Sequence, residues 1–391
     1  MGFVRRAGLA AAVAAAPLGL AYRFALAYRA RAGYPRQHPP QITPADLGLP
    51  FEATTIPSGD LQLPAWFIPA RGGRPGPGVA LVHGWESARD RTLPNALFLH
   101  AAGFHCLTID IRGHGANPAE VLPLSAGEFG LDAGAAFRAL IDRPEVTIGA
   151  IAGHSMGAIG AILAGAADPR VAAIVATSGP ADPYRLTRQT FHLAHLPIPD
   201  PIAYPLAWLT TRVYLAPRGH TVAEISATRA IARYRGPLLL AHGEADQVVP
   251  FSHLRRLAAA ARSTRVAGES AVVETFALPD GQHSWLYEDP TYRATVARFL
   301  TVALGGPLTP DEAAAAAAAA PAERVPDGET RFAAVAETPG GFHTLARVAL
   351  PGATRLPAAE IGGAGAGAGS GAAASPGDTG VAPDADEPGL G

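Results

Sequence analysis

The chain has 391 residues, more than one ordinary core needs, so one large domain with appendages or two domains are expected. Hydrophobic residues make up 48% of the chain and charged residues only 16%, so a large core can form beneath a thinly charged surface. The net charge of −2 excludes the strongly basic balance of a nucleic-acid-binding protein. The single cysteine, Cys106, excludes an intramolecular disulfide and is predicted to be a small core residue.

Residues 1–36 form a separate N-terminal hydrophobic segment. Its apolar run, Ala7–Tyr28, is interrupted only by Arg23 and is long enough for a helix that crosses a bilayer, which takes about 20 residues. The segment therefore predicts a single membrane anchor and a membrane-associated protein. The alternatives are export after cleavage of a signal peptide at Ala30-Arg31-Ala32, a twin-arginine signal, or an Ala-rich helix that lies on the body of the protein.

The proline-rich residues 37–50 predict a linker, and residues 51–305 then alternate short apolar segments with longer Ala- and Leu-rich segments. Ser58-Gly59-Asp60 predicts a hairpin between Thr55-Ile56 and Leu61–Ile68. Further strands are expected at Val79–Val82, Phe104–Ile109, Val146–Ala152, Val171–Thr177, Leu238–Ala241 and Val272–Ala277, and helices at Asn95–Ala102, Glu128–Ile141, Ala158–Ala167 and His253–Ala261. This alternation predicts an α/β fold with a mostly parallel central sheet and helices on both faces.

Two regions fall outside the alternation. The connection from Gly179 to Leu238 is too long for a structureless loop, so a helical cap insertion is expected at about residues 180–235. Residues 306–391 predict an Ala-, Gly- and Pro-rich tail that is largely disordered, because the Gly-Ala composition of residues 361–391 cannot bury enough apolar surface. Within the tail, Asp311–Ala320 fits a short helix, and Arg331–Leu350 fits either a strand pair or no regular structure.

The motif Gly153-His154-Ser155-Met156-Gly157 joins an apolar strand to a helix of small residues. A nucleophilic serine has to leave the sheet on a sharp turn, and glycines on both sides let neighbouring backbone come close. The start of the following helix favours developing negative charge. Ser155 is therefore the predicted nucleophile, and a glycine-rich turn without chemistry is the alternative.

An oxyanion hole is predicted beside Ser155. The strand Val79–Val82 ends at His83-Gly84-Trp85, where a backbone N–H can face the serine. The N–H groups of Met156 and Trp85 are the predicted donors, and His83 is expected to pack the loop. Trp85 and His154 are the residues predicted to bind substrate.

The predicted acid is Asp246 and the predicted base is His283, each in a loop that follows a strand. Glu244 and Asp182 are the rival acids. The order Ser155, Asp246, His283 is the nucleophile-acid-base order expected of a serine nucleophile on a mostly parallel α/β sheet. The three loops would share the carboxyl edge of that sheet.

Other candidate sites are weaker. Asp110 and His114 could form a catalytic pair, but a structural role in a polar loop is the preferred interpretation. His192 and His195 have no further ligand placed to join them, so no metal is expected. The glycines at 362–371 do not follow a strand, so no dinucleotide cofactor is expected either.

Residues 51–303 resemble α/β-hydrolase fold proteins, in the branch that contains serine aminopeptidase-like and lysophospholipase/esterase-like members. The matching motifs are His83-Gly84, Asp110-Ile111-Arg112-Gly113-His114-Gly115, Gly153-His154-Ser155-Met156-Gly157, His242-Gly243-Glu244-Ala245-Asp246-Gln247-Val248-Val249-Pro250 and Gly281-Gln282-His283. The resemblance implies a triad of Ser155, Asp246 and His283 that works without a cofactor.

The expected function is hydrolysis of a carboxylic ester through an acyl-enzyme. The cap is rich in Leu, Ala, Pro, Tyr and Trp and has no cluster of acids, which favours an acyl ester or an amphipathic, lipid-like substrate. A serine peptidase or amidase of the same fold is the alternative. The alternative from another class is a non-catalytic, membrane-tethered binding protein on a hydrolase scaffold.

Overall fold

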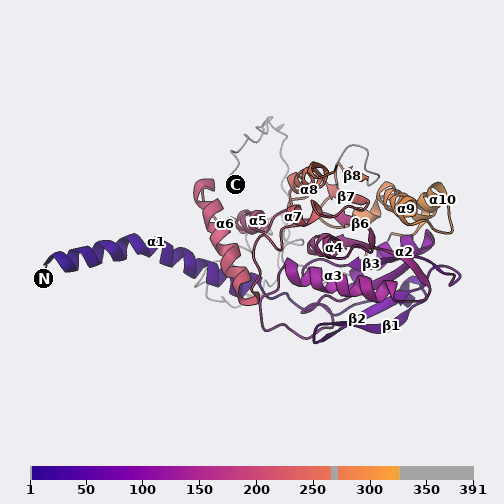
Figure 1. The fold of residues 1–391 in the computed structure, drawn as a ribbon, viewed down its shortest axis with the longest axis horizontal. Coiled ribbons are helices and arrows are strands. Elements are labelled where there is room, and N and C mark those ends of the chain that lie inside the picture. Colours follow the sequence, from indigo (N-terminus) through magenta and orange to yellow (C-terminus); the bar gives the residue numbers. More distant parts are fainter. Residues whose placement is uncertain (1, 266–271, 323, 326–391) are drawn as a thin grey trace, which may run out of the picture. The chain divides into compact units, whose positions relative to one another are not determined.

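The computed structural model describes residues 2–265, 272–322 and 324–325. These residues form a sheet of eight strands in the order β1-β2-β4-β3-β5-β6-β7-β8 (Figure 1). The first two neighbour pairs, β1 with β2 and β2 with β4, are antiparallel, and all others are parallel. The strands are β1 (Glu52–Ser58), β2 (Leu61–Ile68), β3 (Gly76–Val82), β4 (His105–Ile109), β5 (Val146–His154), β6 (Val171–Thr177), β7 (Leu238–Gly243) and β8 (Val273–Leu278). The predicted mostly parallel sheet is confirmed.

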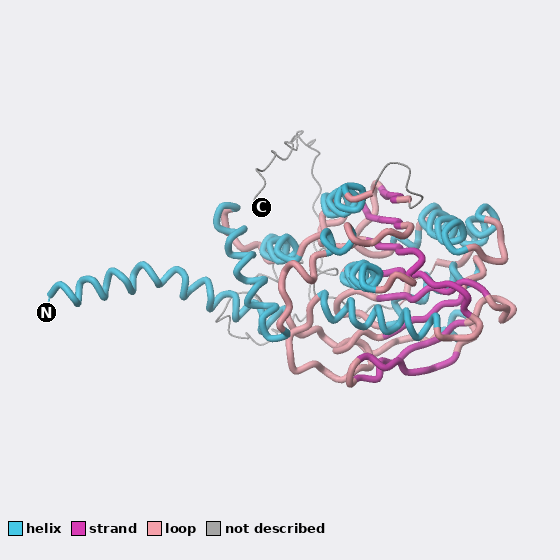
Figure 2. Tube along the Cα trace, in the orientation of Figure 1, coloured by secondary structure: helices cyan, strands magenta, loops and turns pink. Residues whose placement is uncertain are grey.

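Helices cover both faces of this sheet (Figure 2). One hydrophobic cluster joins the sheet to α3, α4, α7 and α8, and a second joins it to α2, α9 and α10. The helices are α2 (Leu93–Ala101), α3 (Ala126–Ile141), α4 (Met156–Ala167), α7 (Ala227–Ile231), α8 (Ser252–Ser263), α9 (Pro290–Leu304) and α10 (Pro310–Ala319). The helices expected at Asn95–Ala102, Glu128–Ile141, Ala158–Ala167, His253–Ala261 and Asp311–Ala320 are all present within a few residues.

Strand β3 explains why the central strands are apolar throughout. Val79 and Leu81 lie in the cluster with α2 and α9, whereas Ala80 and Val82 lie in the cluster with α3 and α4. Successive side chains of a strand point to opposite faces, so a strand covered on both sides needs apolar residues at every position.

The long connection after β6 contains helices, as the sequence predicts for a cap. They are α5 (Pro183–Leu193), α6 (Asp200–Leu215) and the short 3-10 turn η3 (Ala216–Arg218), and α7 follows before β7. Asp182 precedes α5 and accepts hydrogen bonds from Ser226 and Thr228, at the start of α7. These contacts tie the two ends of the insertion together.

The N-terminal residues form one helix, α1 (Gly2–Ala32), whose last turns pack on the cap. The rings of Phe24 and Tyr28 meet Phe191 of α5 edge to face, at centroid distances of 5.4 and 5.9 Å. Arg29 donates a hydrogen bond of 3.0 Å to the carbonyl of Val213 in α6. The C-terminal part of the apolar run in the sequence therefore packs against the cap helices α5 and α6.

None of the helices in the described ranges combines the length and the apolar character that a bilayer crossing needs. Membrane attachment and export stay predictions.

Residues that follow α1 also lie against the body. Pro44–Leu47 form a 3-10 turn, η1, and Leu49 is buried in the cluster with α2 and α9. Cys106 is fully buried in β4, and burial raises the pKa of its thiol. The predictions for residues 331–350 and 361–391 lie outside the described residues.

Candidate active site

Ser155 stands between the end of β5 and the start of α4, in a backbone conformation that few residues adopt. Its φ is +55° and its ψ is −118°. A Cβ on Gly153 would lie 2.1 Å from the carbonyl oxygen of Gly157, and one on Gly157 would lie 2.3 Å from that of Val82. Only glycine fits at either position, so the strand, the turn and the helix can cross closely enough to push Ser155 out of the sheet.

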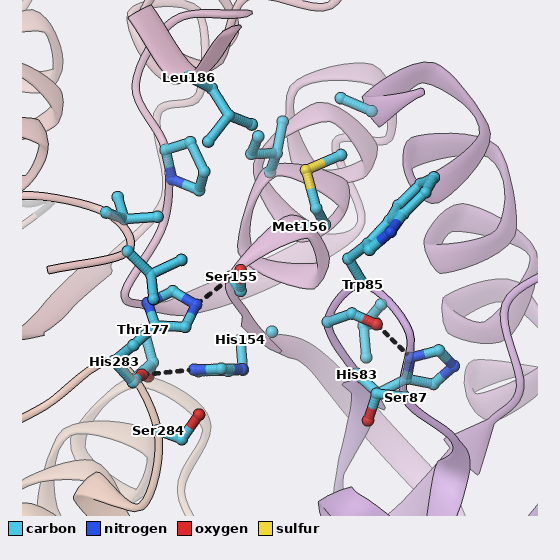
Figure 3. Close-up of a pocket in the computed structure, with 18 of the residues that line it drawn as sticks. His83, Trp85, Ser87, His154, Ser155, Met156, Thr177, Leu186, His283 and Ser284 are labelled. Atoms are coloured by element: carbon cyan, nitrogen blue, oxygen red, sulfur yellow. Dashed lines mark hydrogen bonds between the residues drawn. The ribbon is translucent and has the colours of Figure 1, made fainter. Parts of the chain in front are cut away.

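Ser155, His283 and Asp246 form a hydrogen-bonded chain (Figure 3 shows its serine-histidine half). Ser155 Oγ lies 3.0 Å from His283 Nε2, and His283 Nδ1 lies 2.8 Å from Asp246 Oδ2. All three residues are buried. The three predicted triad residues are thus brought together from the ends of β5, β7 and β8.

The surroundings of Asp246 keep its carboxylate charged. Burial opposes ionisation, but the neighbouring His283 and hydrogen bonds from His242 and His283 outweigh it and hold the pKa of Asp246 below its usual range. The N–H groups of Val248 and Val249 donate to Oδ1 at 2.9 and 2.8 Å. Oδ2 faces His283 Nδ1 at 2.8 Å and His242 Nε2 at 3.1 Å.

The rival acids lie elsewhere. The side chain of Glu244 is exposed, and the carboxylate of Asp182 is used within the cap. Neither is bonded to His283 in the described structure, whereas Asp246 is.

His154 holds the loop that carries His283. Its Nε2 lies 2.8 Å from the backbone oxygen of His283, so this nitrogen donates the bond (Figure 3). Burial and the nearby His283 lower the pKa of His154 to about 3, so its ring stays neutral. The residue lines the cavity, as expected of a substrate contact, but its bond to the base loop is a positioning contact that the sequence does not indicate.

The predicted oxyanion donors flank Ser155. Met156 is the first residue of α4, and a Cβ on Gly84, just before Trp85, would lie 3.2 Å from Ser155 Cβ. The indole of Trp85 lies against Phe129 of α3 and lines the cavity (Figure 3). Met156 follows Ser155 directly and the backbone of Gly84-Trp85 lies next to it, so both predicted donors are near the serine, as an oxyanion hole requires.

The loop behind Trp85 is fixed by His83. Its Nε2 accepts a hydrogen bond of 3.0 Å from the N–H of Ile111, and its Nδ1 donates one of 2.7 Å to Gly84 O. Burial lowers the pKa of His83 to about 4, so the ring carries no charge. These contacts agree with the loop-packing role expected of His83.

Asp110 and His114 do not form a catalytic pair. The Asp110 carboxylate binds Arg89 and the N–H of Ala116, and His114 Nδ1 is bonded to the carbonyl of Arg112 at 2.9 Å. These contacts fit the structural role in a polar loop that is expected of Asp110 and His114. Within the described ranges, no three His, Cys, Asp or Glu side chains are grouped as a metal site would require.

A cavity of about 230 Å³ opens at Ser155 and has two walls. The cap-side wall includes Tyr28, Ala32, Leu186, Thr187, Thr190, Thr211 and Tyr214, from α1, α5 and α6. The sheet-side wall consists of Phe98, Leu99, Leu286, Tyr292 and Val296, from α2, the 3-10 turn η4 (Leu286–Glu288) and α9. The cavity is predominantly apolar, so it suits a substrate with hydrocarbon parts.

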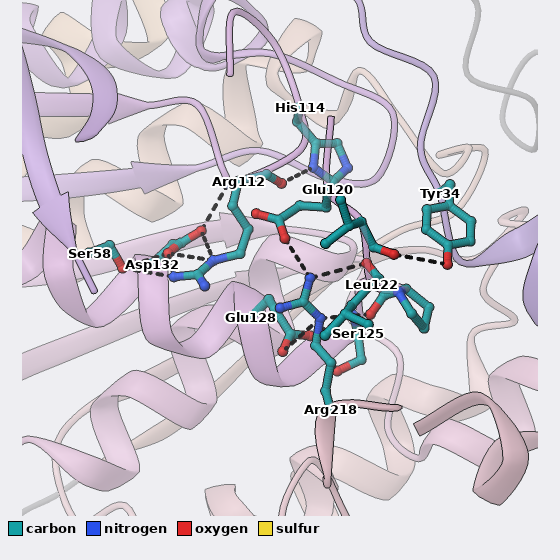
Figure 4. Close-up of polar contacts among 12 residues, drawn as sticks. Tyr34, Ser58, Arg112, His114, Glu120, Leu122, Ser125, Glu128, Asp132 and Arg218 are labelled. Carbon is teal, nitrogen blue, oxygen red and sulfur yellow. Dashed lines mark hydrogen bonds and ion pairs between the residues drawn. The ribbon is translucent and has the colours of Figure 1, made fainter. Parts of the chain in front are cut away.

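A charged cluster fastens the cap to the body (Figure 4). Arg218 donates to Pro123 O at 2.8 Å and to Glu120 Oε2 at 2.7 Å. Glu128 is buried at the start of α3, where it accepts hydrogen bonds from the backbone and hydroxyl of Ser125. His220 of the cap binds the other oxygen of Glu128 at 2.7 Å, which holds the cap-side wall over the serine.

Comparison with known proteins agrees with this architecture. The model of the Alpha/beta hydrolase family matches residues 79–298. Two uncharacterized proteins of Mycobacterium tuberculosis, from strains CDC 1551 and H37Rv, are each 28% identical to this chain over 224 residues, which is 54% of this chain and 71% of theirs.

Solved structures show a similar fold. An esterase of Pyrococcus furiosus aligns with a TM-score of 0.55 and 22% identity over 70% of this chain and 98% of its own. An acylaminoacyl peptidase of Pyrococcus horikoshii aligns with a TM-score of 0.50 and 16% identity over 66% of this chain and 42% of its own. With more than half of its length matched by the family model, the chain belongs to the alpha/beta hydrolase family.

Proposed function

We propose that this protein is a serine hydrolase that cleaves carboxylic esters through an acyl-enzyme, with Ser155 as the nucleophile. The observation that carries the proposal is the pair of hydrogen bonds from Asp246 through His283 to Ser155. This arrangement couples a nucleophile to a base and the base to a group that orients it.

In the proposed mechanism, His283 Nε2 removes the Ser155 proton as Oγ attacks the carbonyl carbon of the ester. Asp246 keeps the Nδ1–H of His283 in place and stabilises the imidazolium that forms. The N–H groups of Met156 and Trp85 bind the oxyanion. His283 then donates the proton to the leaving alcohol, and the same steps with water release the acid and regenerate Ser155.

The cavity supports an apolar ester as the substrate. The sheet-side wall is built from Leu, Phe, Tyr and Val side chains and the cap-side wall from Leu, Ala, Tyr and Thr. Among the residues that the structure describes, no acidic side chain lines the cavity. A cationic group on the substrate would have no carboxylate to pair with there, which disfavours a basic peptide. An ester whose acyl and alcohol parts lie against the two walls would bury hydrocarbon on both sides of Ser155.

The test is hydrolysis of short p-nitrophenyl esters by purified wild type, Ser155→Ala and His283→Ala. We expect each substitution to lower kcat by about a thousandfold or more. Retained hydrolysis by Ser155→Ala would overturn the assignment of the nucleophile.

Two further measurements separate the alternatives. A fluorophosphonate probe should label wild type and not Ser155→Ala, and an unlabelled wild type would favour a binding protein. A matched panel of esters and amides should show faster cleavage of the esters, and faster cleavage of the amides would favour a peptidase or amidase.

A further inference from the structure

Four hydroxyl-bearing side chains from three helices form two hydrogen-bonded pairs on the cap-side wall of the cavity, which also includes Tyr214. Tyr28 Oη of α1 is 2.9 Å from Thr190 Oγ1 of α5, and Thr187 Oγ1 of α5 is 2.9 Å from Thr211 Oγ1 of α6. All four residues line the cavity at Ser155. They form a polar strip in a cavity that is otherwise largely apolar.

The hydrogens of this strip are all used within the protein. Thr190 Oγ1 donates to the backbone oxygen of Thr187 at 2.7 Å, and Thr211 Oγ1 donates to that of Ala207 at 2.7 Å. A hydroxyl has one hydrogen. The hydrogen in the Tyr28–Thr190 bond must therefore come from Tyr28. The hydrogen of Thr187 is shared between Thr211 Oγ1 and the backbone oxygen of Pro183, which lies 3.1 Å from Thr187 Oγ1.

Tyr28 gives its hydrogen to Thr190 and is also in contact with the hydroxyl of Thr187. The Thr187 hydrogen is directed at Thr211 and Pro183, so the Tyr28 oxygen keeps acceptor capacity. Burial raises the pKa of the phenol, which stays protonated. Its ring is held against Phe191 and Tyr214, at centroid distances of 5.9 and 6.1 Å. The Tyr28 oxygen is thus a fixed acceptor on the cavity wall, and a ligand that bonds to it has to supply the hydrogen.

We propose that Tyr28 is a specificity-determining residue that accepts a hydrogen bond from a hydroxyl or amino group on the part of the substrate lying against the cap-side wall. The inference rests on the proposed ester hydrolysis, since it concerns the same site. The favoured substrate class is an ester that is apolar against the sheet-side wall and carries a hydrogen-bond donor at its other end.

The proposal makes α1 part of the working enzyme. Signal cleavage after Ala32 would remove Tyr28 together with Ala32, and both residues line the cavity. The segment that carries the hydrophobic run of the sequence therefore also completes the substrate site.

The experiment uses two pairs of esters in which a terminal methyl replaces a hydroxyl of similar size. The first pair, 2-hydroxyethyl and propyl butanoate, differs in the alcohol; the second, ethyl 6-hydroxyhexanoate and ethyl heptanoate, differs in the acyl group. The measured quantity is the ratio of kcat/KM within each pair. We expect Tyr28→Phe, which keeps the ring, to lower the ratio of hydroxyl to methyl ester about fivefold in at least one pair.

One matched variant separates this role from a structural one. Tyr34→Phe removes a hydroxyl just after α1 that bonds to Val121 O and does not line the cavity, so neither ratio should change.

Equal ratios in wild type and Tyr28→Phe would overturn the inference, and so would a Tyr34→Phe variant that reproduces the loss. Fluorophosphonate labelling of Ser155 should be the same in all three proteins, which shows that the site is intact. A wild type that is neither labelled nor active on any of the esters would instead overturn the proposed function and the inference with it.

Discussion

Two regions of the active site are built by different means. One is the edge of the sheet formed by the carboxyl ends of its strands, which holds Ser155, and the other is the cap-side wall of the cavity. At the edge, backbone segments cross so closely that Gly153 and Gly157 leave no space for a Cβ. On the cap side, helices meet through rings and hydroxyls, as between Tyr28 and Thr190, which are 162 residues apart in the chain.

This difference separates reaction type from substrate choice. A site defined by backbone geometry holds the reacting groups rigidly and cannot accept an added atom without losing that geometry. A wall made of side-chain contacts can exchange one hydroxyl for a methyl group while the helices stay packed. Substitutions at the edge should therefore abolish turnover, and substitutions on the cap side should change which substrates are turned over fastest.

The largest effect is expected for Asp246→Asn at the edge. An amide cannot hold the Nδ1–H of His283 as the carboxylate does, so the imidazole is no longer kept in the form that takes the Ser155 proton. We expect kcat to fall about a thousandfold or more, measured with p-nitrophenyl esters. The control is Glu244→Gln, an exposed carboxylate nearby, which should keep near wild-type kcat; equal losses in the two variants would contradict the assignment.

Gly157→Ala should come next. Its methyl group would overlap the backbone oxygen of Val82. Val82 ends β3, which is held between β4 and β5, so this oxygen cannot move away. We expect a loss of about 3 kcal/mol in the free energy of unfolding, measured with urea, together with loss of fluorophosphonate labelling. Gly219→Ala in the cap, where a Cβ meets nothing within 4 Å, is the matched control and should retain labelling, although its φ of +72° carries some strain. Wild-type labelling in Gly157→Ala would show that the edge is less rigid than argued.

The edge could be predicted from the sequence because its features are local. Glycines two residues either side of Ser155, and acid and base candidates after later strands, are properties of the chain order alone. The parallel sheet follows from apolar strands that alternate with helices, and the structure confirms it. The choice of Asp246 over Glu244 also needed only the loop position.

The cap-side wall could not be predicted in the same way. Nothing local in the sequence pairs Tyr28 with Thr190, or Arg218 with Glu120 and Glu128. The N-terminal run was interpreted from its hydropathy alone, because packing of its last turns against α5 and α6 depends on where the cap helices lie. The bond from His154 to the His283 carbonyl was missed for the same reason: it joins two loops that only the fold brings together.

The two regions should also respond oppositely to pH. Burial lowers the pKa of His114 at the edge from 6.5 to about 3, so protonation favours the unfolded chain, and stability present above pH 6.5 is lost as the pH falls. At the cap contact, the hydrogen bond to Glu128 raises the pKa of His220 above 6.5, so its contribution is present below that pH and is lost as the pH rises through the raised value.

Urea unfolding at pH 7 and pH 5 tests this difference. For a histidine that stays neutral when folded, linkage predicts a loss of about 2 kcal/mol between these pH values. His114→Gln should remove about that much of the wild-type loss, whereas His220→Gln should leave the loss unchanged or increase it. If the free energy of unfolding lost between pH 7 and pH 5 were smaller in His220→Gln than in His114→Gln, the opposite pKa shifts assigned to the two histidines would be contradicted.

The smallest effect is expected for Tyr214→Phe on the cap side. The Tyr214 hydroxyl of α6 lies 3.2 Å from the carbonyl of Ala32 and 2.5 Å from that of Leu124, so one group ties α1 and the segment before α3 to the cap. Removing it should cost about 1 kcal/mol, seen in urea unfolding, and should speed tryptic cleavage at Arg31. Because the ring and the sheet edge are retained, labelling of Ser155 should stay at the wild-type level. Tyr34→Phe is the control for both readouts, and a Tyr214→Phe variant that lost labelling would mean that the cap-side wall positions the reacting groups as well as the substrate.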